Sequence, residues 1–290
     1  MDVDGIVTAL LAGPLPKGPL VAALPMYDWP EERAVVDAQW VRLREALRAK
    51  GVDAPEHLAR CNADLPTFHG SSVDLEPDAL DLAALWRHPG LLFAQTCWGP
   101  LELWLGDAVR VVGQEDYSGV EGGDGEFYAS AIVMRGDDLR GLSEAPPPLT
   151  YRGEPLVSPA FGPHKGAGDS LSQSPSHLWG GVRGGGTSLH ALLIGQRLTY
   201  NAPDSMSGYL ALERDLGGLD VFNERVISGG HRASIRMVAN GDADVAAVDC
   251  KTWALALQHE PAARGLVVVG WTQKRKGLPY VCAGRLSQGS

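Results

Sequence analysis

The sequence predicts an α/β protein of two lobes, with mixed or parallel sheets flanked by helices. Apolar segments typical of buried strands alternate with amphipathic helical segments along most of the 290 residues. Examples of such strand segments are Leu20–Leu24, Leu91–Gln95 and Val245–Val248. Because the chain is longer than one small core usually requires, we expect two lobes.

The composition and charge restrict the kinds of partner that the chain can bind. The chain is 44% hydrophobic and 21% charged, which is ordinary for a globular protein, and its formal net charge is -10. Nucleic-acid phosphates require a basic face, so this charge argues against a nucleic-acid partner. A small anion held by local dipoles remains compatible with it.

Cysteine spacing and the N-terminus predict a cytoplasmic protein with no cofactor, no metal and no direct membrane insertion. The four cysteines lie far apart without a metal-finger pattern or a disulfide framework, which favours a reducing compartment. The apolar stretch Ile6–Leu11 is too short to span a membrane, and no basic residue precedes Lys17, so a secretory signal is not visible.

The predicted first lobe contains two strand ends that could face a ligand. A helix is expected at Glu31–Lys50, after the strand Leu20–Leu24, and Tyr27 lies between them. Ligands bind at the carboxyl ends of strands in open α/β sheets, although Tyr27 could equally pack at the rim. Thr96 follows the strand Leu91–Gln95 in the same way. The neighbouring Cys97 is a buried structural thiol or, less simply, a nucleophile.

The stretch Asp204–Tyr209 is the strongest candidate for an anion site. It follows a short predicted strand, Gln196–Thr199, and precedes a helical pattern, so Ser205 and Ser207 lie where a strand passes into a helix. First-turn N–H groups lack partners within a helix and carry partial positive charge, so they can hold an oxyanion together with these hydroxyls. Alternatively, Asp204 or Ser205 is an ordinary N-cap.

Two later strand ends also carry polar side chains. His231 begins a predicted helix after Val221–Ile227, and Asp249 follows the strand Val245–Val248. His231 could be satisfied by the backbone, and Asp249 could be an N-cap. Their repeated placement at strand-to-helix junctions nevertheless indicates one cleft.

The expected domain organisation has four parts. Residues 1–19 form an N-terminal tail, and residues 20–118 and 252–290 form the first lobe. Residues 119–251 form the second lobe, with a loop-like insertion at about 142–195 where the hydrophobic pattern is lost. The glycine-rich stretch Ser118–Gly125 is a plausible crossing between the lobes.

Three segments together resemble the phosphate/phosphonate-type substrate-binding proteins of ABC transporters, which have the type II periplasmic-binding fold. They are Asp204-x-x-Ser207-Gly208-Tyr209, Gly230–Ser234 and Gly241–Asp249. Leu24–Tyr27 and Gln95–Cys97 look like segments of a cytosolic-looking branch. The pattern departs from the family at Trp98-Gly99, where a glycine followed by an aromatic is expected, and in the insertion.

The resemblance implies two lobes joined by two crossings, with a ligand held between them and closure by a hinge. It implies that Ser205, Ser207 and Gly208 hold phosphoryl-like oxygens and that His231 bonds the same group. Tyr27 would line the opposite lobe, and Asp249 would meet a cationic or hydroxyl substituent. The complete expected ligand-binding set is Tyr27, Thr96, Ser205, Ser207, Gly208, Tyr209, His231 and Asp249.

Three functions are compatible with these features of the sequence. The first is non-catalytic binding of a small oxyanion (phosphate, phosphonate or phosphate ester) by a solute-binding or sensor protein, with a transporter or regulatory protein as a possible partner. The second is a cytoplasmic enzyme on the same fold, with His231 and Asp249 as an acid/base pair and Cys97 as a possible nucleophile. The third is an interaction protein that uses the insertion as its contact surface.

Overall fold

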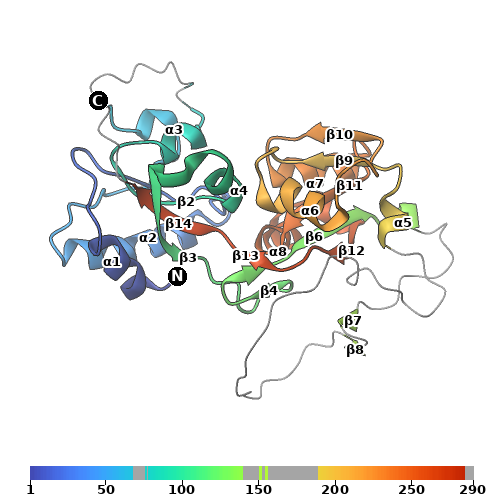
Figure 1. The fold of residues 1–290 in the computed structure, drawn as a ribbon, viewed down its shortest axis with the longest axis horizontal. Coiled ribbons are helices and arrows are strands. Elements are labelled where there is room, and N and C mark those ends of the chain that lie inside the picture. Colours follow the sequence, from blue (N-terminus) through green and yellow to red (C-terminus); the bar gives the residue numbers. More distant parts are fainter. Residues whose placement is uncertain (68–75, 77, 140–149, 152–153, 156–188, 285–290) are drawn as a thin grey trace.

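The computed structural model contains two helix-covered sheets and a narrow ribbon that connects them (Figure 1). The structure describes residues 1–67, 76, 78–139, 150–151, 154–155 and 189–284. Most of the loop-like insertion expected at 142–195 therefore lies outside the described residues. Its described parts are β7 (Thr150–Tyr151), β8 (Glu154–Pro155) and α5 (Leu189–Leu193).

The first sheet has four strands in the order β1-β2-β14-β3. Strands β1 and β2 are parallel, and β14 is antiparallel to both β2 and β3, so the sheet is mixed. The strands are β1 (Val21–Ala23), β2 (Leu91–Gln95), β14 (Pro279–Ala283) and β3 (Val109–Gln114). A strand from the C-terminal part of the chain thus lies in the middle of the first lobe.

Helices cover both faces of this sheet, and this explains why β2 is fully buried and apolar up to its last residue, Gln95. One face packs against α1 and α2, and the other against α3 and η2. The stripe Val36, Trp40, Leu43 and Leu47 of α2 is buried, as its spacing predicts. The helical segments of this lobe are α1 (Val3–Leu11), α2 (Arg33–Arg48), η1 (Asn62–Asp64), α3 (Leu82–Trp86), α4 (Trp98–Pro100), η2 (Leu101–Leu105) and η3 (Gly106–Ala108).

Helix α1 occupies the region where a loose N-terminal tail was expected. Asp2 caps it by accepting a hydrogen bond from the Gly5 N–H, and Ile6, Val7 and Leu10 enter the first core. The prediction of a loose start was wrong because these apolar residues follow helical spacing and have a sheet face to cover.

The second sheet has five strands in the order β10-β9-β11-β6-β12. Strands β10, β9 and β11 are parallel, whereas β6 runs antiparallel to both β11 and β12. The strands are β10 (Glu224–Ile227), β9 (Arg197–Tyr200), β11 (Val245–Asp249), β6 (Ser130–Arg135) and β12 (Leu266–Trp271). This sheet is therefore mixed as well, in agreement with the predicted fold class.

Helices again form two layers around the second sheet. Helices α5 and α6 cover one face, and α7, α8 and η7 cover the other. The helical segments are η4 (Asp137–Leu139), η6 (Met206–Leu210), α6 (Ala211–Leu216), α7 (His231–Asn240), α8 (Cys250–His259) and η7 (Pro261–Gly265). Residues 252–271 thus pack with the second sheet, which differs from the predicted return to the first lobe at residue 252.

Two segments connect the lobes. The chain passes from β3 to β6 through β4 (Gly123–Asp124) and β5 (Phe127–Tyr128), and returns from β12 to β14 through β13 (Arg275–Lys276). These three short strands pair in the order β13-β5-β4, so the two crossings support each other between the lobes (Figure 1). No helix in the described part of the chain is both long and apolar enough to cross a membrane.

Candidate ligand-binding site between the lobes

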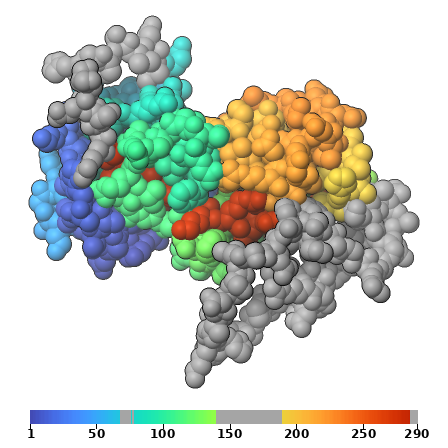
Figure 2. Space-filling model, viewed as in Figure 1, coloured from blue at the N-terminus to red at the C-terminus, as the bar shows by residue number. Residues whose placement is uncertain are grey.

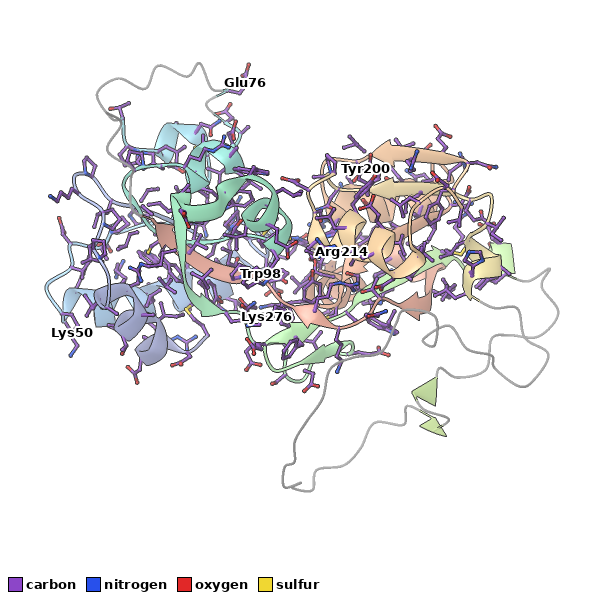
Figure 3. The ribbon with its side chains drawn as sticks, viewed as in Figure 1. Lys50, Glu76, Trp98, Tyr200, Arg214 and Lys276 are labelled. Carbon is purple, nitrogen blue, oxygen red and sulfur yellow. The ribbon has the colours of Figure 1, made fainter. Side chains whose placement is uncertain are left out.

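The two lobes touch each other beside the crossings (Figure 2). Trp98, at the start of α4, lies on the edge of the first lobe that faces the second (Figure 3). Next to it, Gly99 is so close to the second lobe that an added Cβ would lie 1.8 Å from the carbonyl oxygen of Asp204. The family pattern expects a glycine followed by an aromatic at these two positions, whereas this chain has Trp98 followed by Gly99. The glycine, which has no side chain, therefore lies at the close contact.

The Ser205–Gly208 stretch forms the start of a continuous helix made of η6 and α6. Ser205 is its N-cap, since its Oγ accepts a hydrogen bond from the Gly208 N–H at 3.1 Å. The Ser207 Oγ lies 3.4 Å from the Ser205 Oγ and is equally buried. The N-cap interpretation is therefore confirmed for Ser205, and Ser207 presents a second hydroxyl at the positive end of the helix.

His231 joins this helix start to α7, of which it is the first residue. Its Nε2 lies 2.8 Å from the Ser207 Oγ and 3.6 Å from an oxygen of Asp249. Burial lowers the pKa of His231, and the nearby Asp249 carboxylate only partly opposes this shift, so the ring is held neutral. Two helix N-termini and a neutral imidazole consequently meet at one place.

The same contacts argue against the enzymatic alternative. In a catalytic relay, one ring nitrogen takes the proton and the other is oriented by the acid. Here Nε2 of His231 faces both Ser207 and Asp249, while Nδ1 has no hydrogen-bond partner among the described residues. Cys97 is buried, which raises its pKa, and its Sγ accepts the Met206 N–H at 3.3 Å, so the thiol is unsuited to act as a nucleophile.

Asp249 and Tyr27 link the two lobes. One carboxylate oxygen of Asp249 accepts the Thr252 N–H at 2.9 Å, which makes Asp249 the N-cap of α8, and also accepts the Tyr27 hydroxyl at 3.0 Å. The Tyr27 oxygen lies 3.0 Å from that of Tyr117. Burial, and next the charge of Asp249, raise the pKa of Tyr27 well above its usual value, so its hydroxyl stays protonated and can donate.

Thr96 and Tyr209 differ in their surroundings. Thr96 is fully buried at the end of β2, where its N–H donates to the Pro279 carbonyl, but its hydroxyl has no hydrogen-bond partner in the described structure. Tyr209 is half-buried, and its ring packs against Tyr200 with 4.7 Å between centroids. The structure thus shows a packing contact for Tyr209 and an unused hydroxyl for Thr96.

Buried polar atoms without a hydrogen-bond partner concentrate at this junction of the lobes. Apart from Trp40 and Arg44, those found within the described residues lie at ends of strands, at helix starts or in the crossing. They are Gln95 Oε1, Thr96 Oγ1, Trp98 Nε1, Tyr128 OH, Ser130 Oγ, Asn201 Oδ1 and His231 Nδ1. Folded proteins rarely leave such atoms unpaired, so each of these atoms could pair with a further polar group at the junction.

Ion pairs hold the lobes together around the site. Lys251 on α8 lies 2.7 Å from the buried Glu115, and its ammonium lies 4.4 Å from the Tyr27 ring centroid. Arg232 on α7 pairs with Glu31 at 2.9 Å and lies over the Trp29 ring at 4.4 Å. The first lobe supplies Tyr27, Glu31 and Trp29, so these contacts cross between lobes.

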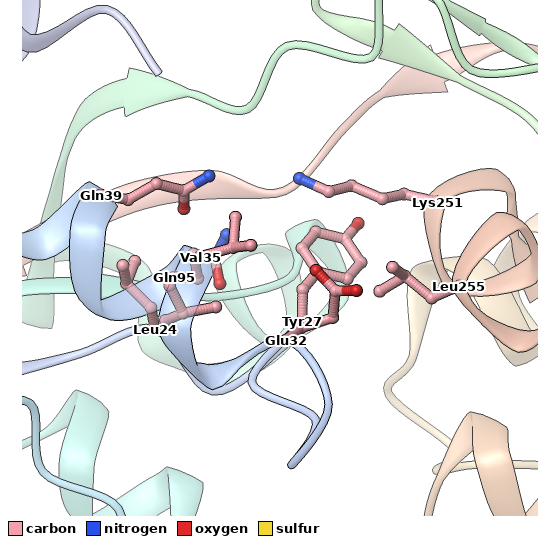
Figure 4. A pocket seen from close by; sticks show the side chains of 9 residues that line it. Leu24, Tyr27, Glu32, Val35, Gln39, Gln95, Lys251 and Leu255 are labelled. Atoms are coloured by element: carbon pink, nitrogen blue, oxygen red, sulfur yellow. The ribbon is translucent and has the colours of Figure 1, made fainter. Parts of the chain in front are cut away.

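A cavity of about 40 Å³ lies between the lobes beside Tyr27 (Figure 4). Gln39 and Lys251 approach it from opposite lobes (Figure 4), and Tyr27 and Glu32 of the first lobe also line it. It is lined by Leu24, Tyr27, Glu32, Val35, Val36, Gln39, Gln95, Lys251 and Leu255. This volume has room for about three waters, so the lobes lie close together behind Tyr27.

Sequence reasoning did not identify Tyr117, Tyr128 and Asn201. The two tyrosines flank the glycine-rich stretch Ser118–Gly125, which was recognised only as a possible crossing. Asn201 follows β9, and its side-chain oxygen would lie 2.0 Å from a Cβ at Gly208, so a larger residue there would displace the Asn201 side chain. Tyrosines in a crossing and an asparagine at a strand end are too common for their residue types alone to mark a site.

Two helix-covered lobes that share a buried polar site at their strand ends define a two-lobed ligand-binding protein. The chain belongs to the family of ABC transporter, phosphonate, periplasmic substrate-binding proteins, whose model matches residues 108–289. This match extends over more than half of the chain. It confirms the resemblance that the sequence motifs indicated and makes the chain a binding protein for a small molecule. No curated protein matches the chain significantly.

Solved structures show the same fold. PhnD1 from Prochlorococcus marinus, in complex with methylphosphonate, has a TM-score of 0.52 and 16% identity over 92% of this chain and 77% of that one. A binding protein component of an ABC phosphonate transporter from Pseudomonas aeruginosa has a TM-score of 0.51 and 15% identity, covering 94% of this chain and 71% of that one. At these identities the likeness is one of fold, and it confirms the predicted type II periplasmic-binding architecture.

The predicted cytoplasmic location is wrong, and so is the assignment to a cytosolic-looking branch, because the family is periplasmic. The residues searched for a secretory signal form helix α1 of the folded first lobe, so they carried no information on location. The prediction of a reducing compartment from the cysteines was wrong for a different reason. All four cysteines are free, and Cys97, Cys250 and Cys282 are buried, where they are kept from pairing in any compartment.

Proposed function

We propose that the chain binds a phosphonate, or a closely related phosphate ester, through its tetrahedral oxyanion at the junction of the two lobes. The cluster of buried polar atoms without partners, next to two helix N-termini, carries this proposal. Ser207, the backbone of Gly208 and His231 would hold the oxyanion from the second lobe. Thr96 and Tyr27 would approach it from the first lobe.

Neutral groups dominate the proposed anion contacts. Hydroxyls, helix N–H groups and a neutral imidazole can hold an oxyanion, at about 0.3–1 kcal/mol for each dipole contact and about 1.5–3 kcal/mol for each hydrogen bond to charge. A micromolar site needs about -8 kcal/mol, so several such contacts must act together. Asp249 adds a buried negative charge, and we expect it to face a hydroxyl or cationic substituent and not the oxyanion.

The unpaired atoms also couple binding to closure. Each buried polar atom without a partner costs about 1–3 kcal/mol, and a ligand oxygen that accepts from the Thr96 hydroxyl removes part of this cost. We propose that the two sheets act as lobes that close around the ligand, with the paired crossings β4–β5 and β13 as the hinge. By its family, the protein would deliver the ligand to the membrane component of an ABC transporter.

Calorimetry tests the proposed function. Titration with methylphosphonate should give saturable binding, and Ser207→Ala should weaken it about tenfold or more through loss of one hydrogen bond to charge. Ser118→Ala removes the same group at an exposed position in the crossing and should leave the affinity unchanged. Absence of binding heat and of a thermal shift with phosphate, phosphite and alkylphosphonates alike would refute the proposal.

A further inference from the structure

Tyr128 lies in β5, within the segment that leads from the first lobe to the second. Its side chain is 2% exposed, and its ring stacks on Tyr117 with 5.3 Å between centroids. Tyr27, Cys97 and Met206 belong to the same buried cluster, so the ring lies among residues of both lobes. The Tyr128 hydroxyl has no hydrogen-bond partner within the described part of the chain.

The backbone fixes Tyr128 in this place from two sides. Its strand pairs with Arg275 of the returning crossing and with Gly123 of β4. The carbonyl of the next residue, Ala129, accepts the N–H of Cys250, which directly follows Asp249. The backbone alone therefore holds Tyr128 between the two crossings and the start of α8. Its hydroxyl is not needed to keep it there.

The groups around the Tyr128 hydroxyl belong to the junction of the lobes. Burial raises the pKa of Tyr128 well above its usual value, and the nearby Cys97 and Asp249 raise it further, while the Ser207 side chain, which is near enough to interact with the phenol oxygen without forming a hydrogen bond of normal geometry, acts in the opposite direction. These three residues influence the phenol because they are close to it. The hydroxyl thus stays protonated and lies beside Ser207, one of the residues proposed to hold the oxyanion.

We propose that Tyr128 is a further ligand-binding residue, whose hydroxyl donates a hydrogen bond to an oxygen of the bound oxyanion. This inference rests on the proposed function and adds a contact from the connecting segment to those of the two lobes. A buried hydroxyl without a partner is unfavourable in the protein by itself, and a ligand oxygen removes that penalty. A hydroxyl kept for packing would instead be paired, as that of Tyr117 is.

The substitution Tyr128→Phe distinguishes a role in ligand binding from a role in packing. We expect methylphosphonate to bind the variant about tenfold more weakly, since one hydrogen bond to charge is lost, and the melting temperature without ligand to stay the same or rise. Tyr117→Phe is the matched control, because it removes a hydroxyl that contacts Tyr27 and accepts the Leu278 N–H at 3.0 Å. The control should lower the melting temperature.

The ³¹P chemical shift of bound methylphosphonate gives a second readout, and it should move in Tyr128→Phe because a donor to the oxyanion is lost. Wild-type affinity and an unchanged ³¹P shift in Tyr128→Phe would overturn the inference while leaving the proposed function intact. A melting temperature lowered as far as in Tyr117→Phe, at unchanged affinity, would overturn it in favour of a packing role. If the wild-type protein binds no oxyanion at all, the proposed function fails, and the role of Tyr128 fails with it.

Discussion

Gly99 illustrates how a single residue controls the distance between the lobes. The Asp204 carbonyl oxygen occupies the space that a side chain at position 99 would need. Trp104 reinforces this contact, because its Nε1 donates to the Asp204 carboxylate at 2.9 Å. Since Asp204 directly precedes the N-cap Ser205, a shift of its backbone also displaces the proposed anion site.

Gly99→Ala should therefore keep the lobes apart and weaken methylphosphonate binding by about tenfold or more, because backbone atoms cannot yield as a flexible side chain can. Calorimetry measures the affinity, and small-angle scattering measures the radius of gyration, which should increase. The control is Gly265→Ala, where an added Cβ meets nothing within 4 Å. Equal affinities in the two variants would contradict this account of Gly99.

At the scale of elements, the helix formed by η6 and α6 separates capping from ligand contact. The Ser205 oxygen accepts a hydrogen bond from the Gly208 N–H, whereas the Ser207 hydroxyl faces His231 and the rest of the site. The N-cap interpretation of the sequence and the anion-site interpretation thus fall on two neighbouring hydroxyls. Each can be tested with its own observable.

Ser205→Ala should lower the free energy of unfolding by about 1 kcal/mol, because a buried cap is lost, while Ser205→Gly should cost only a few tenths. Urea unfolding followed by circular dichroism measures both variants. Ser207→Ala and Ser207→Gly are the comparison, since Ser207 does not cap the helix: both should lose the contact with His231 Nε2, and glycine should be no better than alanine there. If Ser207→Gly were clearly more stable than Ser207→Ala, as expected for the N-cap at Ser205, our division of roles would be incorrect.

For the whole molecule, the proposed closure would depend on charged contacts at the rim as well as on the buried site. Arg232 directly follows His231 and reaches Glu31 of the first lobe, and His259 lies 2.6 Å from Glu32. The Arg232 guanidinium lowers the pKa of Glu31 to about 2, so the pair stays charged over the physiological range. These partly exposed pairs favour the closed arrangement and are weakened by salt.

Glu31→Gln should open the molecule slightly, weaken methylphosphonate binding by at most about fivefold, and reduce the salt dependence of the affinity. Scattering and calorimetry at low and high salt measure these effects. Glu56→Gln provides the matched control, because Glu56 pairs with Arg44 and Arg48 inside the first lobe. A salt dependence that is the same in Glu31→Gln as in the wild type would exclude this contact as a closing one.

Local patterns in the sequence predicted most elements of the second sheet and the βα unit at the start of the first. They did not reveal β14, although it lies in the centre of the first sheet. Its position depends on pairing with β2 and β3, which lie far earlier in the chain. The return to the first lobe was expected too early, because α8 and β12 have the same periodicity whichever sheet they cover.

The sequence by itself determined the alternation of strands and helices, the family, and the strand ends that carry Tyr27, Thr96, Ser207, His231 and Asp249. These features are encoded locally, in hydrophobic period and in residue types next to one another. Only the tertiary structure decided which of these side chains meet, and that Tyr117, Tyr128 and Asn201 join them. The reason is physical: hydrogen bonds and burial at the junction of the lobes depend on distances between segments far apart in the chain, which no local pattern specifies.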